Sequence, residues 1–104
     1  MVINMLGSKK KLEILIDEKR LDISNMREVK AKILKDIAVS KEDIVINCSK
    51  IEFLDSSGLS VIMAVFKQLN SQKRKLILCS LNRQPQELMK ITQLHKIFTI
   101  NNSC

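Results

Sequence analysis

The spacing of hydrophobic positions along this chain switches several times between two residues and three or four. Near the start, residues 2–6 form a short apolar run that predicts an edge strand, followed by a turn at Gly7-Ser8. Leu12, Ile14 and Ile16 then alternate with mostly polar neighbours, which is typical of a half-buried strand. The chain is therefore expected to open with two strands.

A helix is expected next, because Asn25 and Glu28 have the spacing of a capping box. Its apolar face would consist of Met26, Val29, Ile33, Leu34 and Ile37. Residues 43–48 are a β-branched run that predicts a third strand. A second helix follows, with an apolar series at Leu59, Ile62, Met63, Phe66 and Leu69.

The last part of the chain continues the alternation. Residues 75–79 predict a strand, and Pro85 suits the first turn of a helix with Leu88, Ile91 and Leu94 facing inward. Residues 97–100 would close the fold as a final strand. Strands that alternate with helices predict an α/β fold with a largely parallel sheet.

Length and composition predict one domain spanning residues 1–104, with an aliphatic core. The chain is 45% hydrophobic but only 3% aromatic. It contains no apolar run of the roughly 20 residues that a membrane span needs, and its N-terminus does not resemble a signal peptide. We therefore expect a soluble, cytoplasmic protein without a membrane span.

Three cysteines without metal-type spacing predict reduced thiols in a reducing compartment. Cys48 and Cys79 each end a predicted strand, as small core residues do, and Cys104 is expected to face solvent. His95 is the only histidine and is expected to help end the last helix. Neither a metal site nor a cofactor is expected.

The formal net charge is +7, and the basic residues are spread along the chain with runs at 9–11 and 73–75. The chain has no Tyr or Trp and only three Phe, so it lacks the stacking platform of a single-strand nucleic-acid binder. We expect no nucleic-acid binding, and we interpret the charge as favouring association with an acidic protein surface.

The segment Asp55-Ser56-Ser57-Gly58 places an acid, two hydroxyls and one of only two glycines between a strand and a helix. In one interpretation, Asp55, Ser56 or Ser57 caps the helix and Gly58 eases the turn. In the other, a serine carries a phosphate that meets the unpaired N–H groups of the helix N-terminus.

This segment resembles the signature of the STAS domain of bacterial anti-sigma factor antagonists. That signature is an apolar pair, then Asp-Ser-Ser/Thr-Gly-Leu-Gly/Ser and an apolar helix. The matching residues here are Phe53-Leu54, Asp55-Ser56-Ser57-Gly58-Leu59-Ser60 and Val61-Ile62-Met63. The order of elements on both sides agrees as well. The resemblance implies a single STAS-type domain with a mixed, mostly parallel sheet flanked by helices.

The resemblance also implies partner switching in transcription regulation. The partner would be an anti-sigma factor that is also a serine kinase of the histidine-kinase-like ATPase type. The unphosphorylated antagonist binds it and frees a sigma factor, phosphorylation at Ser56 releases the antagonist, and a phosphatase resets the switch. Ser57 is the secondary acceptor, and Asp22, Asp55, Ser56, Ser57 and Gly58 are expected to form the partner-binding surface.

Two departures from the family pattern concern this surface. The family usually has Gly-Glu-Leu/Ile-Asp before its first helix, whereas this chain has Lys19-Arg20-Leu21-Asp22. Asp22 is kept, but two cations change the charge at the rim of the presumed docking face. Position 60 is Ser rather than the commoner Gly, which the family tolerates.

Two other functions compete with the antagonist. A STAS subunit of another assembly, such as a transporter ATPase or a sensory complex, would share the same motif. An enzyme would need a base for Ser56, and the only candidate imidazole, that of His95, lies in a late helix-end segment. The chain also lacks a glycine-rich phosphate cradle. We therefore expect a regulatory binding protein that is a kinase substrate rather than an enzyme.

Overall fold

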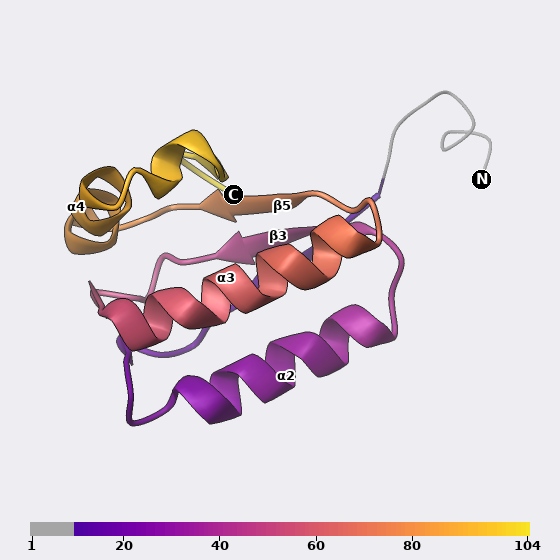
Figure 1. The fold of residues 1–104 in the computed structure, drawn as a ribbon, viewed down its shortest axis with the longest axis horizontal. Helices are drawn as coiled ribbons and strands as arrows, with labels where there is room; N and C mark the ends of the chain where they lie inside the picture. The colour runs from indigo at the N-terminus through magenta and orange to yellow at the C-terminus, as the bar shows by residue number, and fades with distance from the viewer. Residues whose placement is uncertain (1–9) are drawn as a thin grey trace.

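The computed structural model describes residues 10–104, so the predicted strand at 2–6, the turn at 7–8 and Lys9 lie outside the described residues. The elements alternate largely as the hydrophobic pattern predicts (Figure 1). In chain order they are β1 (Lys11–Leu15), β2 (Arg20–Leu21), α2 (Met26–Ala38), β3 (Asp43–Asn47), β4 (Phe53–Leu54), α3 (Ser56–Ser71), β5 (Leu76–Cys79), α4 (Arg83–Ile91), the 3-10 turn η1 (Leu94–Lys96) and β6 (Thr99–Asn101).

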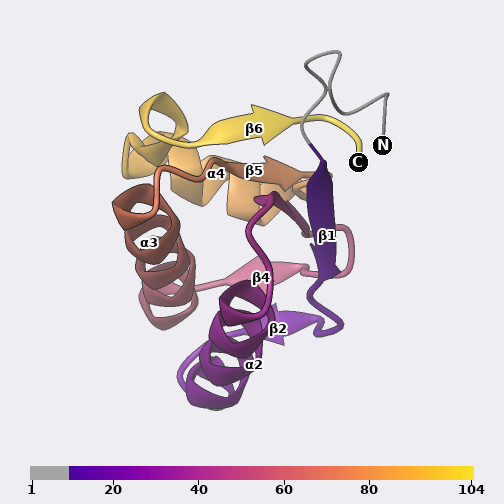
Figure 2. The ribbon, with the colours of Figure 1, turned by 90° about the vertical axis from the view of Figure 1, so that its right-hand side faces the viewer.

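Two sheets organise these elements. The larger has the strand order β1-β3-β5-β6, and every pairing in it is parallel. Helices α2 and α3 lie side by side against one face of this sheet (Figures 1 and 2). The prediction of an α/β domain with a mostly parallel sheet is confirmed. Within residues 10–104 every strand pairing is parallel, so the described part of the sheet is parallel rather than mixed.

The smaller sheet pairs β2 with β4 in parallel, with Arg20 opposite Phe53 and Leu21 opposite Leu54. The hydrophobic pattern did not predict these strands, because two residues are too few to display a period. They matter for function, because β4 leads directly into the Asp55-Ser56 segment and β2 leads directly into Asp22.

The burial of the strands follows their place in the sheet. In β1, at one edge of the described sheet, Ile14 is buried while Lys11, Glu13 and Leu15 are exposed. All four residues of β5, which lies between β3 and β6, are buried. A continuous apolar run of this kind is typical of a central parallel strand, whose two faces are both covered.

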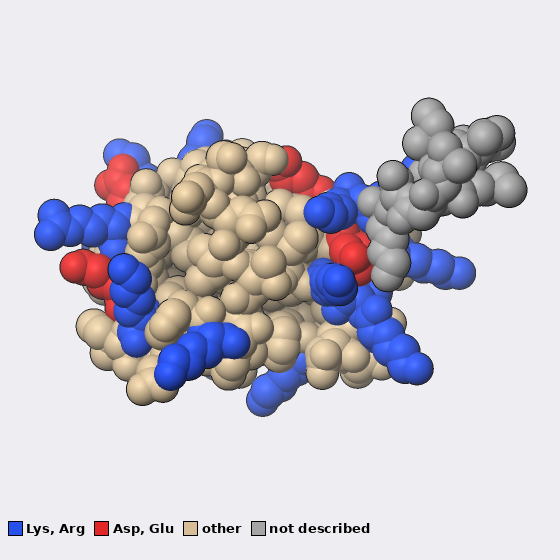
Figure 3. Space-filling view, turned by 90° about the horizontal axis from the view of Figure 1, so that it is seen from above, with Lys and Arg blue, Asp and Glu red and all other residues tan. Residues whose placement is uncertain are grey.

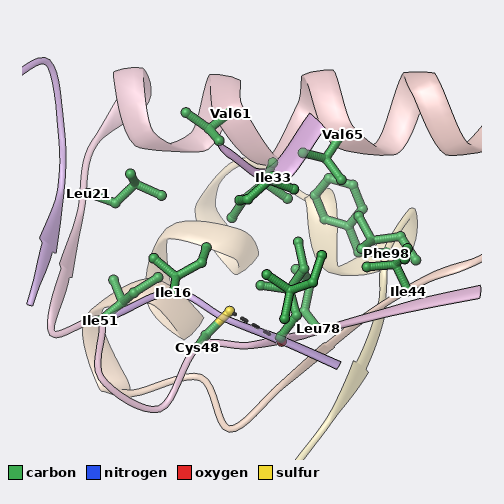
Figure 4. Packing of buried hydrophobic residues seen from close by; sticks show 14 of the residues in the cluster. Ile16, Leu21, Ile33, Ile44, Cys48, Ile51, Val61, Val65, Leu78 and Phe98 are labelled. Carbon is green, nitrogen blue, oxygen red and sulfur yellow. Dashed lines mark hydrogen bonds between the residues drawn. The ribbon is translucent and has the colours of Figure 1, made fainter. Parts of the chain in front are cut away.

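The core fills the space between the sheet and α2 and α3 (Figure 4). Val61 and Val65 of α3 and Ile33 of α2 belong to the same buried cluster as Ile44 and Leu78 of the sheet. Cys48 is also buried here, and burial raises the pKa of its thiol to about 12, so it remains a neutral thiol at physiological pH. The prediction that Cys48 is a small core residue is confirmed.

The predicted capping box at the start of α2 is wrong. Asn25 is the N-cap residue, but its side chain makes no capping hydrogen bond. Instead its Oδ1 accepts from the Asp22 N–H at 3.0 Å, and its Nδ2 donates to the Arg20 carbonyl at 2.7 Å. Asn25 therefore stabilises the loop that joins β2 to α2.

The last helix is rotated from the predicted orientation. Leu88 is half-buried, but Ile91 is 79% exposed and Leu94 belongs to η1, while Met89 and Pro85 are buried. The predicted face extended across the end of the helix, where Gln93 adopts a left-handed conformation with φ of 62°. Pro85 in the first turn is confirmed, and the His95 Nδ1 lies 3.3 Å from the Met89 carbonyl near the helix end.

The prediction of three reduced thiols is wrong for two of them. Cys79, at the end of β5, forms a disulfide with Cys104, and their Cα atoms are 5.2 Å apart. Cys79 is fully buried and Cys104 is exposed, as the sequence indicated. Spacing could not predict the pairing, because it arises only when the residues after β6 turn back to the end of β5.

The charges are distributed around the molecule. In the face shown in Figure 3, Lys and Arg side chains project from the rim and the middle carries no charged side chains. The cations of this face do not gather into a stripe that could follow a nucleic-acid backbone. Within residues 10–104, no helix is both long enough and apolar enough to cross a membrane.

Candidate functional site

Asp55 begins α3 as its N-cap residue. Its backbone is extended (φ −107°, ψ −171°), and its Oδ1 accepts from the Gly58 N–H at 2.8 Å. This bond satisfies one of the N–H groups that a helix start leaves without an internal partner. Of the three capping residues considered from the sequence, Asp55 is the one that caps the helix.

Ser56 is the first residue of α3 and is exposed, whereas Ser57 is half-buried. The expected position of Ser56 at the helix N-terminus is therefore confirmed. The Ser57 carbonyl accepts a 2.5 Å hydrogen bond from the Ser60 hydroxyl, so Ser60 closes the first turn of the helix. Of the two adjacent hydroxyls, that of Ser56 is the more accessible to another molecule.

Gly58 is buried, and it allows β2 to approach α3 closely. A Cβ at this position would overlap the Leu21 carbonyl oxygen and would lie 2.6 Å from Leu54 Cδ1. The glycine is therefore required by the packing against β2, and easing a turn is not its role. Its contribution to the predicted partner-binding surface is to set the spacing beneath it.

Asp22 and Asp55 lie side by side in this arrangement. Each is the residue that directly follows the Leu21–Leu54 pair of the β2–β4 sheet, and the Asp55 N–H points to the Leu21 carbonyl at 3.5 Å. The fold thus brings together Asp22, Asp55, Ser56 and Ser57, as the resemblance predicted, over the buried Gly58.

Hydrogen bonds hold the Asp22 carboxylate in place. Its Oδ1 accepts from the Ser24 hydroxyl at 2.6 Å and from the Ser24 N–H at 3.0 Å. These bonds and the nearby Arg20 guanidinium lower the pKa of Asp22 below its ordinary value. Asp22 is therefore a fixed anion at neutral pH, with a side chain that is only 16% exposed.

Arg20 lies on the same side of the small sheet. Its guanidinium carbon is 4.3 Å from the centre of the Phe53 ring, and its Nε is 3.3 Å from Asp22 Oδ2. Lys19 and Arg20, the two cations that distinguish this chain from the family pattern, thus have different structural environments. The exposed Lys19 contributes its backbone carbonyl to Glu52 and Phe53, whereas the Arg20 side chain is stacked and paired.

Two amide side chains from the start of α4 support the site from the other side. Gln84 binds both the N–H and the carbonyl of Leu54, at 2.8 and 2.9 Å, as a neighbouring strand would. The Asn82 Nδ2 donates to the Ser49 and Ile51 carbonyls at 2.9 and 2.7 Å. Sequence reasoning missed both residues, because a lone amide gives no signal of a partner so distant in the chain.

The other chemistry considered from the sequence does not converge here. Within residues 10–104, no hydrogen bond links His95 to Ser56, and His95 contacts Met89 instead. The same residues contain no cluster of three or more His, Cys, Asp or Glu side chains that could hold a metal ion.

Comparison with known proteins assigns the fold to a family. The sequence model of the family described as STAS domain matches residues 14–104 of this chain. The chain belongs to the STAS domain family. The STAS fold is also that of a solved structure, the anti-sigma-factor antagonist (STAS) domain protein from Planctomyces limnophilus. That structure has a TM-score of 0.81 at 16% identity, over 88% of this chain and 82% of that one.

Two relatives of this STAS domain have descriptions that name a regulatory role. It is 33% identical to the anti-sigma-B factor antagonist of Listeria monocytogenes over 75 residues, which are 70% of this chain and 66% of that protein. It is 34% identical to the anti-sigma F factor antagonist of Paenibacillus polymyxa over 59 residues, 57% of this chain and 50% of that protein. The chain is thus similar to two anti-sigma factor antagonists, and the matched residues cover half of one and about two thirds of the other.

Proposed function

We propose that this STAS domain is an anti-sigma factor antagonist whose binding to its partner is controlled by a phosphoryl group on Ser56. The observation that carries the proposal is the exposed Ser56 hydroxyl at the first residue of α3, next to the capping Asp55. The similarity to two anti-sigma factor antagonists supports the class of partner.

The partner is an anti-sigma factor that is also a serine kinase of the histidine-kinase-like ATPase type. It transfers the γ-phosphoryl group of ATP to Ser56 Oγ, and ADP leaves while the hydroxyl proton passes to the kinase. The unphosphorylated protein binds this partner and frees a sigma factor. A phosphatase hydrolyses the phosphoserine and restores the binding form. Since sigma factors act in transcription, the proposal also implies a cytoplasmic protein.

Electrostatics explains why one phosphoryl group would be enough for release. Phosphorylation adds nearly two negative charges. They would lie beside Asp55 and the anionic Asp22, on a surface that must lose water to dock. Repulsion and desolvation both oppose docking, so the complex dissociates without refolding of the domain.

The test is to incubate the protein with a candidate anti-sigma kinase and ATP, and to map the phosphate by mass spectrometry. We expect phosphate on Ser56, and on Ser57 only as a secondary site. Ser56→Ala should bind the kinase and stay bound when ATP is added. Ser56→Asp should bind more weakly, by about tenfold or more, because it adds one charge of the two that a phosphoryl group carries.

Two further variants serve as controls. Ser71→Ala removes an exposed serine at the far end of α3, so it should bind and release as the native protein does. Asp55→Asn keeps a good capping residue but removes a carboxylate, so it should fold normally and retain more binding after phosphorylation. Phosphate on another residue, or Ser56→Asp that binds as tightly as the native serine, would refute the switch.

The alternative, a STAS subunit of a transporter ATPase or a sensory complex, is tested by the same purified protein. Capture of a defined transporter ATPase, and failure to bind any anti-sigma kinase, would favour that assignment. In that case Ser56→Asp would not be expected to control an association with an anti-sigma factor.

A further inference from the structure

Arg20 occupies a position from which it can respond to a phosphoryl group on Ser56. Residues at alternate positions of a strand share a face, so Arg20 and Asp22 lie on one side of β2. The paired Phe53 and the following Asp55 lie on the same side of β4. The contacts of Arg20 with Phe53 and Asp22 agree with this shared face.

The Arg20 side chain also lies near the start of α3. Its guanidinium is over Phe53, the residue opposite Arg20, and its Nε contacts the carboxylate of Asp22, the residue that follows β2. Because β2 and β4 are parallel, Asp22 and Asp55 follow the same end of the small sheet, and Ser56 comes directly after Asp55. The contact with Asp22 therefore places Nε at the end of the small sheet at which Ser56 begins α3.

Most of the guanidinium donors are available. Among the described residues, the only hydrogen bond from the Arg20 side chain is that from Nε to Asp22, and the side chain is 62% exposed. Stacking on Phe53 restricts the side chain without using its N–H groups. A planar guanidinium with free Nη donors suits two parallel hydrogen bonds to phosphate oxygens.

We propose that Arg20 binds the phosphoryl group of phosphoserine 56 within the same molecule, an inference that rests on the proposed function of Ser56. The phosphate takes the Nη donors of Arg20 and competes with Asp22 for the guanidinium. Phosphorylation therefore rearranges the docking surface as well as charging it, because Arg20 moves toward α3 and Asp22 loses an ion-pair partner. Arg20, one of the two cations that depart from the family pattern, would thus respond directly to phosphorylation of Ser56 in the same molecule.

The surrounding charges define what the phosphate would experience without Arg20. Asp22 and Asp55 are on its own face, and Glu18 joins the same loop through a 3.3 Å hydrogen bond from Asn25. On the far side of β4, α4 contributes Arg83, whose Nε is 3.9 Å from Glu87. The carboxylates favour the monoanionic phosphate and raise its second pKa, whereas Arg20 favours the dianion and lowers it.

The test uses the full chain with phosphoserine installed genetically at position 56, so that no kinase is needed. Phosphorus NMR follows the second pKa of the phosphoserine against pH. We expect the pKa in the native background to lie about 0.5 to 1 pH unit below that in Arg20→Gln. Arg20→Lys, which keeps the charge but loses the planar fork, should fall between them.

Arg83→Gln is the matched control, because it removes an arginine at the same end of the molecule on the opposite side of β4. It should leave the phosphoserine pKa within about 0.2 unit of the native value. Equal pKa values in the native and Arg20→Gln proteins, or an equal shift in Arg83→Gln, would overturn the proposal.

A second measurement needs no substitution. The Nε–Hε signal of Arg20 in proton–nitrogen NMR should shift when phosphoserine replaces serine at position 56, and an unchanged signal would contradict the proposal. If a kinase places its phosphate elsewhere, the proposed function fails. The titration still decides separately whether Arg20 binds phosphoserine 56.

Discussion

A methyl group at position 58 would collide with the backbone of β2, so the close approach of β2 to α3 requires glycine at this position. We expect Gly58→Ala to lower the free energy of unfolding by about 1–3 kcal/mol, because the Leu21 carbonyl is backbone and cannot rotate away. Urea unfolding followed by circular dichroism measures this change.

Ser60→Ala is the control for the Gly58 substitution. Ser60 is exposed on the same turn of α3 and loses only a local hydrogen bond to the Ser57 carbonyl. Its free energy of unfolding should remain within about 0.5 kcal/mol of the native value. If Gly58→Ala is no less stable than Ser60→Ala, β2 does not pack against α3 as described.

At the scale of elements, Gln84 acts as a third strand beside β4. Gln84→Leu keeps the approximate size of the side chain but leaves both the N–H and the carbonyl of Leu54 without their partner. We expect a loss of about 1–3 kcal/mol in the free energy of unfolding. The amide protons near Leu54 should also exchange faster with solvent than those of β3 in the same variant.

Gln86→Leu provides the comparison on the same helix. Gln86 donates to the carbonyl of Leu81, just before α4, at 2.8 Å, and among the described residues its side chain makes no hydrogen bond to β4. Fast exchange at Leu54 should therefore appear in Gln84→Leu and be absent from Gln86→Leu. The same exchange rates in both variants would show that Gln84 is not what supports β4.

The elements also show where sequence reasoning succeeds. Five predicted elements, β1, α2, β3, α3 and β5, have enough residues for a hydrophobic period, and each was found near its expected bounds. Strands β2 and β4 have two residues each and display no period. The predicted inner face of α4 failed because Ile91 and Leu94 straddle the helix end, where a uniform spacing no longer holds.

The candidate site was predicted in part for the same physical reason. Asp55 and Ser56 are local to a helix start, so their placement follows from chain order alone. The packing role of Gly58 and the bonds of Gln84 depend on segments distant in the chain, which no local pattern reports. The stacking of Arg20 on Phe53 likewise depends on the register of two short strands.

At the scale of the whole molecule, the Cys79–Cys104 disulfide fastens the residues after β6 to β5. The bridge closes a separation of 25 residues, so reduction should lower the free energy of unfolding by about 3 kcal/mol. Urea unfolding with and without a reducing agent measures the difference.

Cys104→Ser tests whether the effect of reduction comes from this bridge. The variant should be insensitive to the reducing agent and should match the reduced native protein. The third thiol, Cys48, is buried and does not take part. Equal stability of the native protein and Cys104→Ser under oxidising conditions would mean that the bridge does not form in solution.

The hydrogen bonds from Asn82 and Gln84 also determine when the site can fold during synthesis. During synthesis, Ser56 leaves the ribosome before Gln84 does, and until then Leu54 has only water for its outer N–H and carbonyl. A pair of two-residue strands is too short to hold by itself. A kinase that recognises the folded surface would therefore find no substrate in a growing chain. Under the proposed switch, each new molecule would therefore complete its folding unphosphorylated, in the form proposed to bind the anti-sigma factor.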